Sequence, residues 1–342
     1  MATHLIGIDE AGYGPNLGPL VVGASMWSVP EETTDLYEHL SDAVSSNSAD
    51  RDRLTIADSK ELYSTSSGLE TLERNVLALL ATTGRTPSNV RELLNEISSL
   101  EFPEAGRLSP QLSLFDSCPA KTVGSSQALN ADYLNEPQKQ PLPIEAGSSS
   151  LGTLRERFET SCAAANIELR RITGACLQPN EFNDLVHGYG NKSTVLTTTS
   201  LLLAKRLIAD NNDTKPVAVH CDKHGGRSRY GDLLSRIFEC DNIAVETESA
   251  AFSSYRFMLN EQPVFISFTA KGEKQLETAL ASMYAKYVRE VVMVCWNAFW
   301  QERLPGIKST AGYPTDAKRF WAEIEHEVKK MKLSKNTLWR VR

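Results

Sequence analysis

The chain has 342 residues, of which 41% are apolar and 23% are charged, a composition typical of a soluble globular protein with one large domain or two ordinary ones. The formal net charge of −7 excludes a uniformly basic nucleic-acid-binding protein, so a polyanion would have to bind a local basic patch. The six cysteines form no CxxC pair, so we expect no structural zinc site. The N-terminus shows no signal-peptide pattern, and no apolar stretch approaches the ~20 residues of a spanning helix. We therefore expect a cytoplasmic protein with no membrane partner.

The first elements are two strands joined by a glycine-rich loop. Residues 4–9 form an apolar run that ends on Asp9, and residues 18–29 form an apolar, β-branched run that ends at Pro30. The connection AGYGPNLGP is too long for a two-residue hairpin, so we expect an antiparallel pair with a shaped loop between its strands.

Residues 64–150 differ in character from the rest of the chain. The first half has helical periodicity in LETLERNVLALLAT and NVRELLNEISSL, whereas the second half is rich in Ser, Pro, Gln and Asn and has no apolar period. We interpret 64–150 as an insertion with a helical first half and a flexible second half, and 1–63 with 151–342 as one domain.

After residue 150 helices and strands alternate. Helices are predicted at 151–166, 181–186, 191–210, 273–301 and 316–332, and strands at 167–177, 215–222, 243–248 and 263–270. This order predicts the α/β class with a mixed central sheet flanked by helices.

Four carboxylates stand at the ends of predicted elements. Asp9 and Glu10 end one strand, Asp222 ends another, and Glu273 follows Gly272 at the start of the long helix. If they converge on one edge of the sheet, these side chains suit a hard divalent cation, Mg²⁺ or Mn²⁺, although a single Asp at a strand end is more often a turn or helix cap.

Several motifs resemble the type 2 ribonucleases H, the ribonuclease HII/HIII family. GIDEAGYGPNLGPLVVGA is similar to the N-terminal signature of that family, IADSKEL to its Asp-Ser-Lys motif, VAVHCD to the strand of its third acid, and ALASMYAKYVRE and GYPTDAKRF to two later segments. The resemblance covers roughly residues 4–63 and 151–342. It implies a ribonuclease H-like fold.

The resemblance also assigns roles to individual residues. Asp9, Glu10 and Asp222 match three of the four metal-site acids; Glu273 would be the fourth by substitution, and Glu277 is the alternative. It further implies substrate contacts, which would be made by Gly12, Tyr13, Gly14, Lys60 and Lys286.

The chain departs from the family pattern in its glycine loop and near its third acid. Tyr13 stands where ribonuclease HII usually has Arg, and KHGGRSRYGD replaces the usual continuation after Asp222 with a basic loop that contacts phosphate or is merely solvated. The segment from Lys318 to Arg342 has eight Lys or Arg against three Glu, which suits sequence-independent phosphate binding or a solvated helix face.

These observations lead to one function and its alternatives. The resemblance implies a metal-dependent endonuclease that cuts the RNA strand of RNA–DNA hybrids, or RNA-containing duplex DNA, leaving 5′-phosphate and 3′-hydroxyl ends. The alternatives are a non-catalytic or weakly active hybrid-binding protein with the same fold, and a related nuclease with an altered substrate. No protein partner is predicted.

Overall fold

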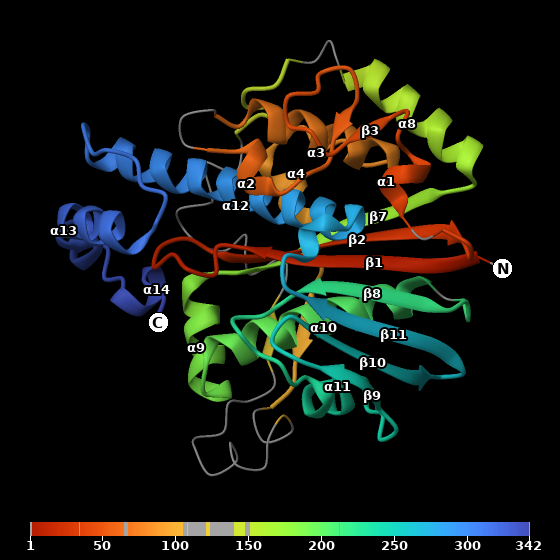
Figure 1. Ribbon diagram of the computed structural model, residues 1–342. Coiled ribbons are helices and arrows are strands. Elements are labelled where there is room, and N and C mark those ends of the chain that lie inside the picture. The colour runs from red at the N-terminus through yellow and green to blue at the C-terminus, as the bar shows by residue number, and fades with distance from the viewer. Residues whose placement is uncertain are drawn as a thin grey trace.

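The computed structural model describes residues 2–33, 35–64, 68–104, 108, 121–123, 140–147, 151–211 and 213–341. Its centre is a seven-stranded sheet with the order β7-β2-β1-β8-β11-β10-β9 (Figure 1). The strands are β1 (Ala2–Ala11), β2 (Leu20–Pro30), β7 (Glu168–Leu177), β8 (Val217–Asp222), β9 (Ala244–Glu248), β10 (Phe252–Leu259) and β11 (Gln262–Thr269).

The sheet is mixed. β8 runs parallel to both β1 and β11, whereas the β1–β2, β2–β7, β10–β11 and β9–β10 pairs are antiparallel. The predicted antiparallel pair at the N-terminus and the predicted α/β class with a mixed sheet are therefore confirmed.

Helices cover both faces of the sheet. They are α1 (Leu36–His39), α2 (Ser59–Leu62), α3 (Glu70–Thr82), α4 (Val90–Asn95), α8 (Leu151–Ala165), α9 (Pro179–Tyr189), α10 (Lys192–Asn211), α11 (Gly231–Phe238), α12 (Leu276–Arg303), α13 (Pro314–Lys330) and α14 (Lys335–Leu338). One hydrophobic core joins α12 with α3, α4 and α8, and a second joins α9, α10 and α11 to the opposite face. Two short ladders, β3 (Val44–Ser45) with β4 (Leu54–Thr55) and β5 (Leu100–Phe102) with β6 (Lys121–Val123), complete the described part.

Helix α12 lies directly on the backbone of β1 and β2. A Cβ atom at Gly7 would lie 2.1 Å from the backbone carbon of Glu277, and one at Gly23 would lie 2.2 Å from the carbonyl oxygen of Ala281. These two glycines let the helix approach the strands at a distance that no larger residue permits. The close approach fixes where the first turns of α12 lie relative to the end of β1.

Two sequence predictions were wrong in detail. The long helix begins at Leu276 instead of 273, because residues 272–274 form a separate 3₁₀ turn, η4 (Gly272–Lys274), and Gln275 is extended. Strand β10 was not predicted at all; its Ser-rich beginning is typical of a loop, and its strand conformation is stabilised by ladders with β9 and β11.

The region predicted as an insertion is only partly described. Helices α3 and α4 agree with its predicted helical first half, and their apolar residues belong to the same core as α12. The prediction of flexibility applies to residues 125–150, of which 125–139 and 148–150 lie outside the described residues. It is wrong for 140–147, because the amides of Ile144, Glu145 and Ala146 donate to the buried Glu73 carboxylate, a contact that no local sequence pattern reveals. The domain division stays a prediction.

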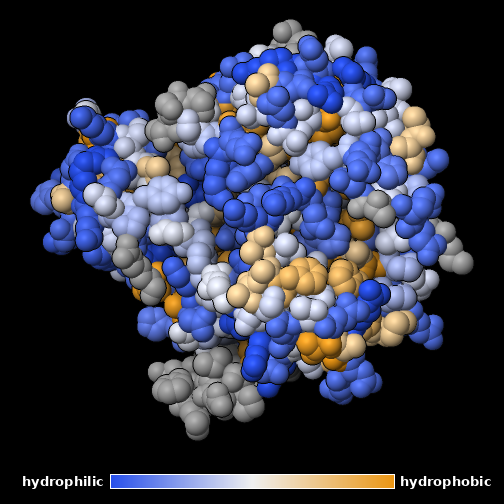
Figure 2. Space-filling model, in the orientation of Figure 1, coloured by the Kyte–Doolittle hydropathy of each residue, from blue (hydrophilic) through white to orange (hydrophobic). Residues whose placement is uncertain are grey.

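Figure 2 shows that hydrophilic residues cover most of the face in view, with apolar residues over the β8–β11–β10 part of the sheet. A hollow of about 660 Å³ there is lined by residues that include Ala218, Met258 and Phe265. No helix among the described residues is both long and apolar enough to cross a membrane.

Candidate metal centre

Three carboxylates meet where the parallel pairing of β1 with β8 ends. The last pair in that register is Ile8 with Cys221, so the residues that follow, Asp9 and Asp222, lie side by side, although β1 itself continues to Ala11 along β2. One carboxylate oxygen from each of Asp9, Glu10 and Asp222 lies within 4.8 Å of the other two. We call these three residues the acid cluster.

The acid cluster is buried enough to make its charge costly. Asp9 is 9% exposed, and burial, then repulsion from Asp222, raises its pKa from 3.8 to about 7. Burial, followed by repulsion from Asp9, raises the pKa of Glu10 well above its ordinary value. The Oε2 atom of Glu10 is buried without a hydrogen-bond partner among the described residues. A bound cation would neutralise the mutual repulsion of the carboxylates and give the buried Glu10 oxygen a partner. An all-oxygen donor set is the set that Mg²⁺ and Mn²⁺ prefer.

Backbone and hydroxyl groups orient the carboxylates. The Glu10 amide donates to Asp9 Oδ1 at 2.7 Å, and the Gly272 amide donates to Asp222 Oδ1 at 2.9 Å. Ser282 of α12 hydrogen-bonds to the Asp9 carboxylate, and its hydroxyl lies 3.1 Å from that of Ser59. The Asp-Ser-Lys motif and the Ala-Ser motif of α12 thus meet behind Asp9.

The predicted fourth acid, Glu273, lies in η4 beside the cluster. Its charge contributes to the raised pKa of Asp9, although as the smallest of the causes, and it is not part of the three-carboxylate group. The alternative acid, Glu277, is buried and lies 2.5 Å from Nδ1 of His220. Glu273 therefore faces the cluster at longer range, whereas Glu277 is held by a histidine.

The glycine loop follows the cluster directly. Gly12 has a φ of 87°, and Gly14 has open space where a Cβ would stand. The ring of Tyr13 lies under the Lys192 ammonium at 4.5 Å, and its hydroxyl packs against Gly225. Burial, then the charge of Glu10, raises the pKa of Tyr13, so the phenol is neutral.

The two predicted substrate lysines lie in different settings. The Lys60 side chain is 82% exposed; its burial lowers its pKa, but attraction by Asp58, Glu273 and the acid cluster outweighs that effect and raises it. Lys286 is largely enclosed: its ammonium contacts Glu290 at 2.8 Å and lies 4.5 Å from the ring centre of Tyr63. Lys60, whose ammonium lies 3.8 Å from the Asp58 carboxylate, is thus exposed enough to reach a ligand at the cluster, and Lys286 is part of an internal network.

The basic loop after Asp222 is engaged with its own surroundings. Lys223 donates to the Ser249 carbonyl at 2.7 Å, and Arg227 donates to Thr194 at 2.9 Å. Whether this loop contacts phosphate stays a prediction.

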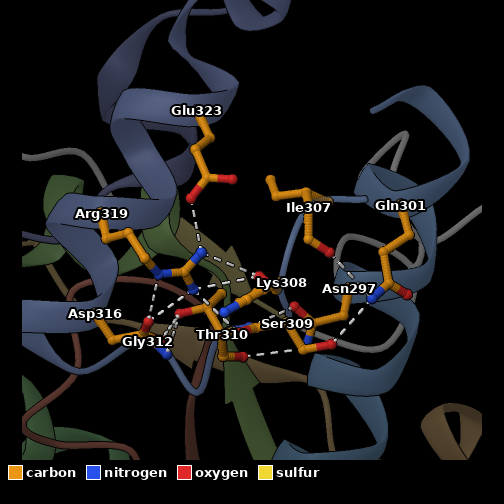
Figure 3. Close-up of polar contacts among 10 residues, drawn as sticks. All are labelled: Asn297, Gln301, Ile307, Lys308, Ser309, Thr310, Gly312, Asp316, Arg319 and Glu323. Atoms are coloured by element: carbon orange, nitrogen blue, oxygen red, sulfur yellow. Dashed lines mark hydrogen bonds and ion pairs between the residues drawn. The ribbon is translucent and has the colours of Figure 1, made fainter. Parts of the chain in front are cut away.

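The segment before α13 is held by polar contacts with α12 and α13, as Figure 3 shows, and it supports the glycine loop from one side. Arg319 donates to the carbonyls of Lys308 and Ser309 and pairs with Asp316 at 2.7 Å, which holds the segment in place. The Gly312 carbonyl then accepts hydrogen bonds from the amides of Asn16 and Leu17 at 2.8 and 3.2 Å. The GYPTDAKRF motif is therefore joined to the glycine loop through its first residue.

Comparison with known proteins found similarity at the level of structure only. No protein-family model and no curated protein matches the chain. Similar solved structures include the ribonuclease H2 from Pyrococcus horikoshii OT3, with 14% identity over 98% of this chain and 92% of that one and a TM-score of 0.40. RNase HII from Archaeoglobus fulgidus, in a complex with PCNA, is 14% identical over 99% of this chain and 94% of that chain, with a TM-score of 0.38. Aquifex aeolicus RNase H3 is 15% identical over 98% of this chain and 71% of that chain, with a TM-score of 0.40.

These structures are type 2 ribonucleases H, the proteins that the sequence motifs resemble. The functional argument below depends on the residues of the site itself.

Four residues at the site were not singled out from the sequence. Ser59, Ser282 and Arg289 lie inside motifs that resemble the family, and their place in those motifs was the available signal. Arg340 also contacts the glycine loop but lies in none of these motifs. No pattern in the sequence distinguishes a buried arginine from an exposed one, so only the packing reveals Arg340.

Proposed function

We propose that the protein is a metal-dependent endonuclease that hydrolyses the RNA strand of RNA–DNA hybrids. The observation that carries the proposal is the partly buried three-carboxylate cluster where the pairing of β1 with β8 ends, with one oxygen of each acid within 4.8 Å of the others. The motif order of the sequence supports the substrate class, since the cluster, the glycine loop and the Asp-Ser-Lys segment come together in space.

Asp9, Glu10 and Asp222 would hold Mg²⁺ or Mn²⁺, which supplies an activated water and charge stabilisation for the leaving oxygen. Ser282 and the amides of Glu10 and Gly272 fix the directions of the carboxylates, so little reorganisation is needed at the reacting phosphate.

Substrate positioning is assigned to two elements beside the cluster. Lys60 carries an exposed ammonium that is attracted to the cluster and that would contact a backbone phosphate. The glycine loop brings main-chain groups close to the strand, where a ribose 2′-hydroxyl distinguishes RNA from DNA.

The second candidate is a hybrid-binding protein with weak or no cleavage. The observation that favours it is that Glu273, the expected fourth acid, lies outside the three-carboxylate group. With three acids the site can hold one metal, whereas a two-metal displacement needs additional ligands.

A cleavage and binding assay separates these functions. The wild-type protein and Asp222→Asn are incubated with a labelled continuous RNA–DNA hybrid, with Mg²⁺, with Mn²⁺ and with EDTA. The endonuclease predicts 5′-phosphate and 3′-hydroxyl products from wild type only, with hybrid binding retained by the variant.

Other outcomes decide among the alternatives. Binding without cleavage by wild type in either metal supports the hybrid-binding protein. Cleavage of a DNA flap or of structured RNA in preference to the hybrid assigns the site to another nuclease substrate.

A further inference from the structure

The C-terminal segment crosses behind the glycine loop and is bonded to it along its length. Leu17 forms a bridge with Trp339, the Arg340 amide donates to the Asn16 carbonyl at 2.8 Å, and Asn16 Nδ2 donates to the Arg340 carbonyl at 3.1 Å. Figure 1 shows this segment, with α14 and the C-terminus, beside the loop that follows β1. Two stretches more than 300 residues apart thus form one structural unit next to the acid cluster.

The Arg340 side chain reaches into the loop. Its guanidinium donates to the carbonyls of Gly12 and Pro15, and its carbon lies 4.9 Å from the ring centre of Phe182. Arg340 is 1% exposed, so these contacts form away from water. A single guanidinium nitrogen, Nη2, donates to both carbonyls, which are three residues apart, and so ties together the two ends of this part of the loop.

The charge of Arg340 has no carboxylate partner among the described residues. Its Nε and Nη1 atoms are buried without hydrogen-bond partners there, and burial, then repulsion from Arg289, lowers its pKa to about 9. At neutral pH the group is still a cation. A buried charge without a partner raises the free energy of the folded state. Such a charge is therefore found mainly where another favourable interaction offsets its desolvation.

A second buried arginine lies under the same loop. Nε of Arg289 is 2.5 Å from where a Cβ of Gly12 would stand, and this nitrogen also lacks a partner in the described part of the chain. Arg289 shares its carboxylate partner, Glu290, with Lys286. Two cations, Arg289 and Lys286, therefore share the Glu290 carboxylate, and Arg340 adds a third positive charge close enough to Arg289 to be repelled by it. Among these four side chains positive charge exceeds negative charge.

We propose that Arg340 is a positioning residue for substrate binding. It shapes the loop from Gly12 to Asn16. Together with Arg289 it also places positive charge on the buried side of that loop, and this charge attracts a phosphate of the nucleic-acid strand to the solvent side. The proposal rests on the proposed function, because it assumes a nucleic-acid ligand at the acid cluster. It explains how a loop with Tyr13 in place of an arginine still attracts an anion.

The test measures binding separately from cleavage. Affinity for a labelled continuous RNA–DNA hybrid is measured in EDTA over a range of salt concentrations for wild type, Arg340→Gln, Arg340→Lys and the control Arg74→Gln. Arg74 is also buried and also has unpartnered guanidinium nitrogens, but it lies in α3, and its charged neighbours are Arg51, Glu70 and Asp50. The melting temperature of each variant shows that it is folded at the temperature of the binding assay.

We expect Arg340→Gln to bind about tenfold more weakly, with a shallower dependence of log K on log salt. Arg340→Lys keeps the charge and should recover most of the affinity and the salt dependence, and Arg74→Gln should bind as wild type does. Amide hydrogen exchange in residues 11–18 should be faster in Arg340→Gln, with or without the hybrid.

An unchanged affinity and salt dependence in Arg340→Gln would overturn the inference, as would an equal loss in Arg74→Gln or in Arg340→Lys. Failure of the proposed function looks different, because it leaves wild type binding the hybrid without cutting it in Mg²⁺ or Mn²⁺.

Discussion

Replacing Asp9 with Asn should stabilise the metal-free protein at alkaline pH. The folded Asp9 carboxyl keeps its proton up to about pH 7, whereas the unfolded one loses it near 3.8. Between these values the folded state binds more protons than the unfolded state, so stability falls as the pH rises through this window. The cause is burial first and the charge of Asp222 second.

The size of the effect follows from the shift. A difference of about three pKa units corresponds to about 4 kcal/mol of unfavourable free energy at pH 8, and about 1.5 kcal/mol of it is already present at pH 5. Asn has nearly the same volume, and its side-chain oxygen can still accept the Glu10 amide that Asp9 Oδ1 accepts at 2.7 Å. We therefore expect Asp9→Asn to raise the free energy of unfolding at pH 8 by about 2–4 kcal/mol in EDTA.

Denaturant unfolding at pH 5 and pH 8 measures this, with and without Mg²⁺. Metal binding stabilises wild type by an amount that grows with the logarithm of the metal concentration above the dissociation constant, and it should cancel the advantage of the variant at pH 8. Asp241→Asn is the control, because Asp241 is an exposed carboxylate outside the cluster.

The reasoning is refuted if metal-free wild type is as stable at pH 8 as at pH 5. It is also refuted if Asp9→Asn destabilises the protein at pH 8 in EDTA while Asp241→Asn does not.

Three further predictions concern cleavage, specificity and packing. Glu273→Gln should lower cleavage of the hybrid more than Glu277→Gln does, since Glu273 acts on the acid cluster and Glu277 is held by a histidine; the opposite ranking in kcat would assign the fourth acid to Glu277. Wild type should have a higher kcat/KM on a continuous hybrid than on duplex DNA with a lone ribonucleotide. Tyr13→Arg should reduce this difference in kcat/KM, because a charge-assisted contact contributes roughly 1.5–3 kcal/mol. Equal kcat/KM on both substrates for wild type contradicts this. Gly7→Ala should lower the free energy of unfolding by about 1–3 kcal/mol because its Cβ would meet the backbone of α12, whereas Gly14→Ala should leave it nearly unchanged, and similar melting temperatures for the two variants would contradict the packing argument.

Much of the scaffold could be predicted from local patterns. The apolar runs ending on Asp9 and Asp222 predict two strands whose last residues are acids, because a terminal acid is favourable where a strand leaves the core. β8 ends on Asp222 as predicted, whereas β1 continues two residues past Asp9 to Ala11 because it pairs with β2 there. Helices α8, α10 and α13 were also predicted to within a few residues of their ends.

The start of α12 shows the limit of such patterns. The helix is predicted from 273, because Glu273, Lys274 and Gln275 are good helix formers ahead of the apolar period. In the structure the Gly272 amide bonds to Asp222 instead, and Lys271 takes a φ of 64°. That bond joins residues 50 positions apart, so no local window contains the information. It moves Glu273 from a helix onto a turn beside the acid cluster.

The sequence by itself determined which acids are candidates for the metal, because Asp9, Glu10 and Asp222 have recognisable positions at strand ends. Only the tertiary structure decided which of them meet, since the parallel register of β1 and β8 places Asp222 beside Asp9. It also decided where positive charge lies around the glycine loop. An arginine such as Arg340 has the same local sequence signal whether it is solvated or buried, and its role depends on contacts with residues more than 300 positions away.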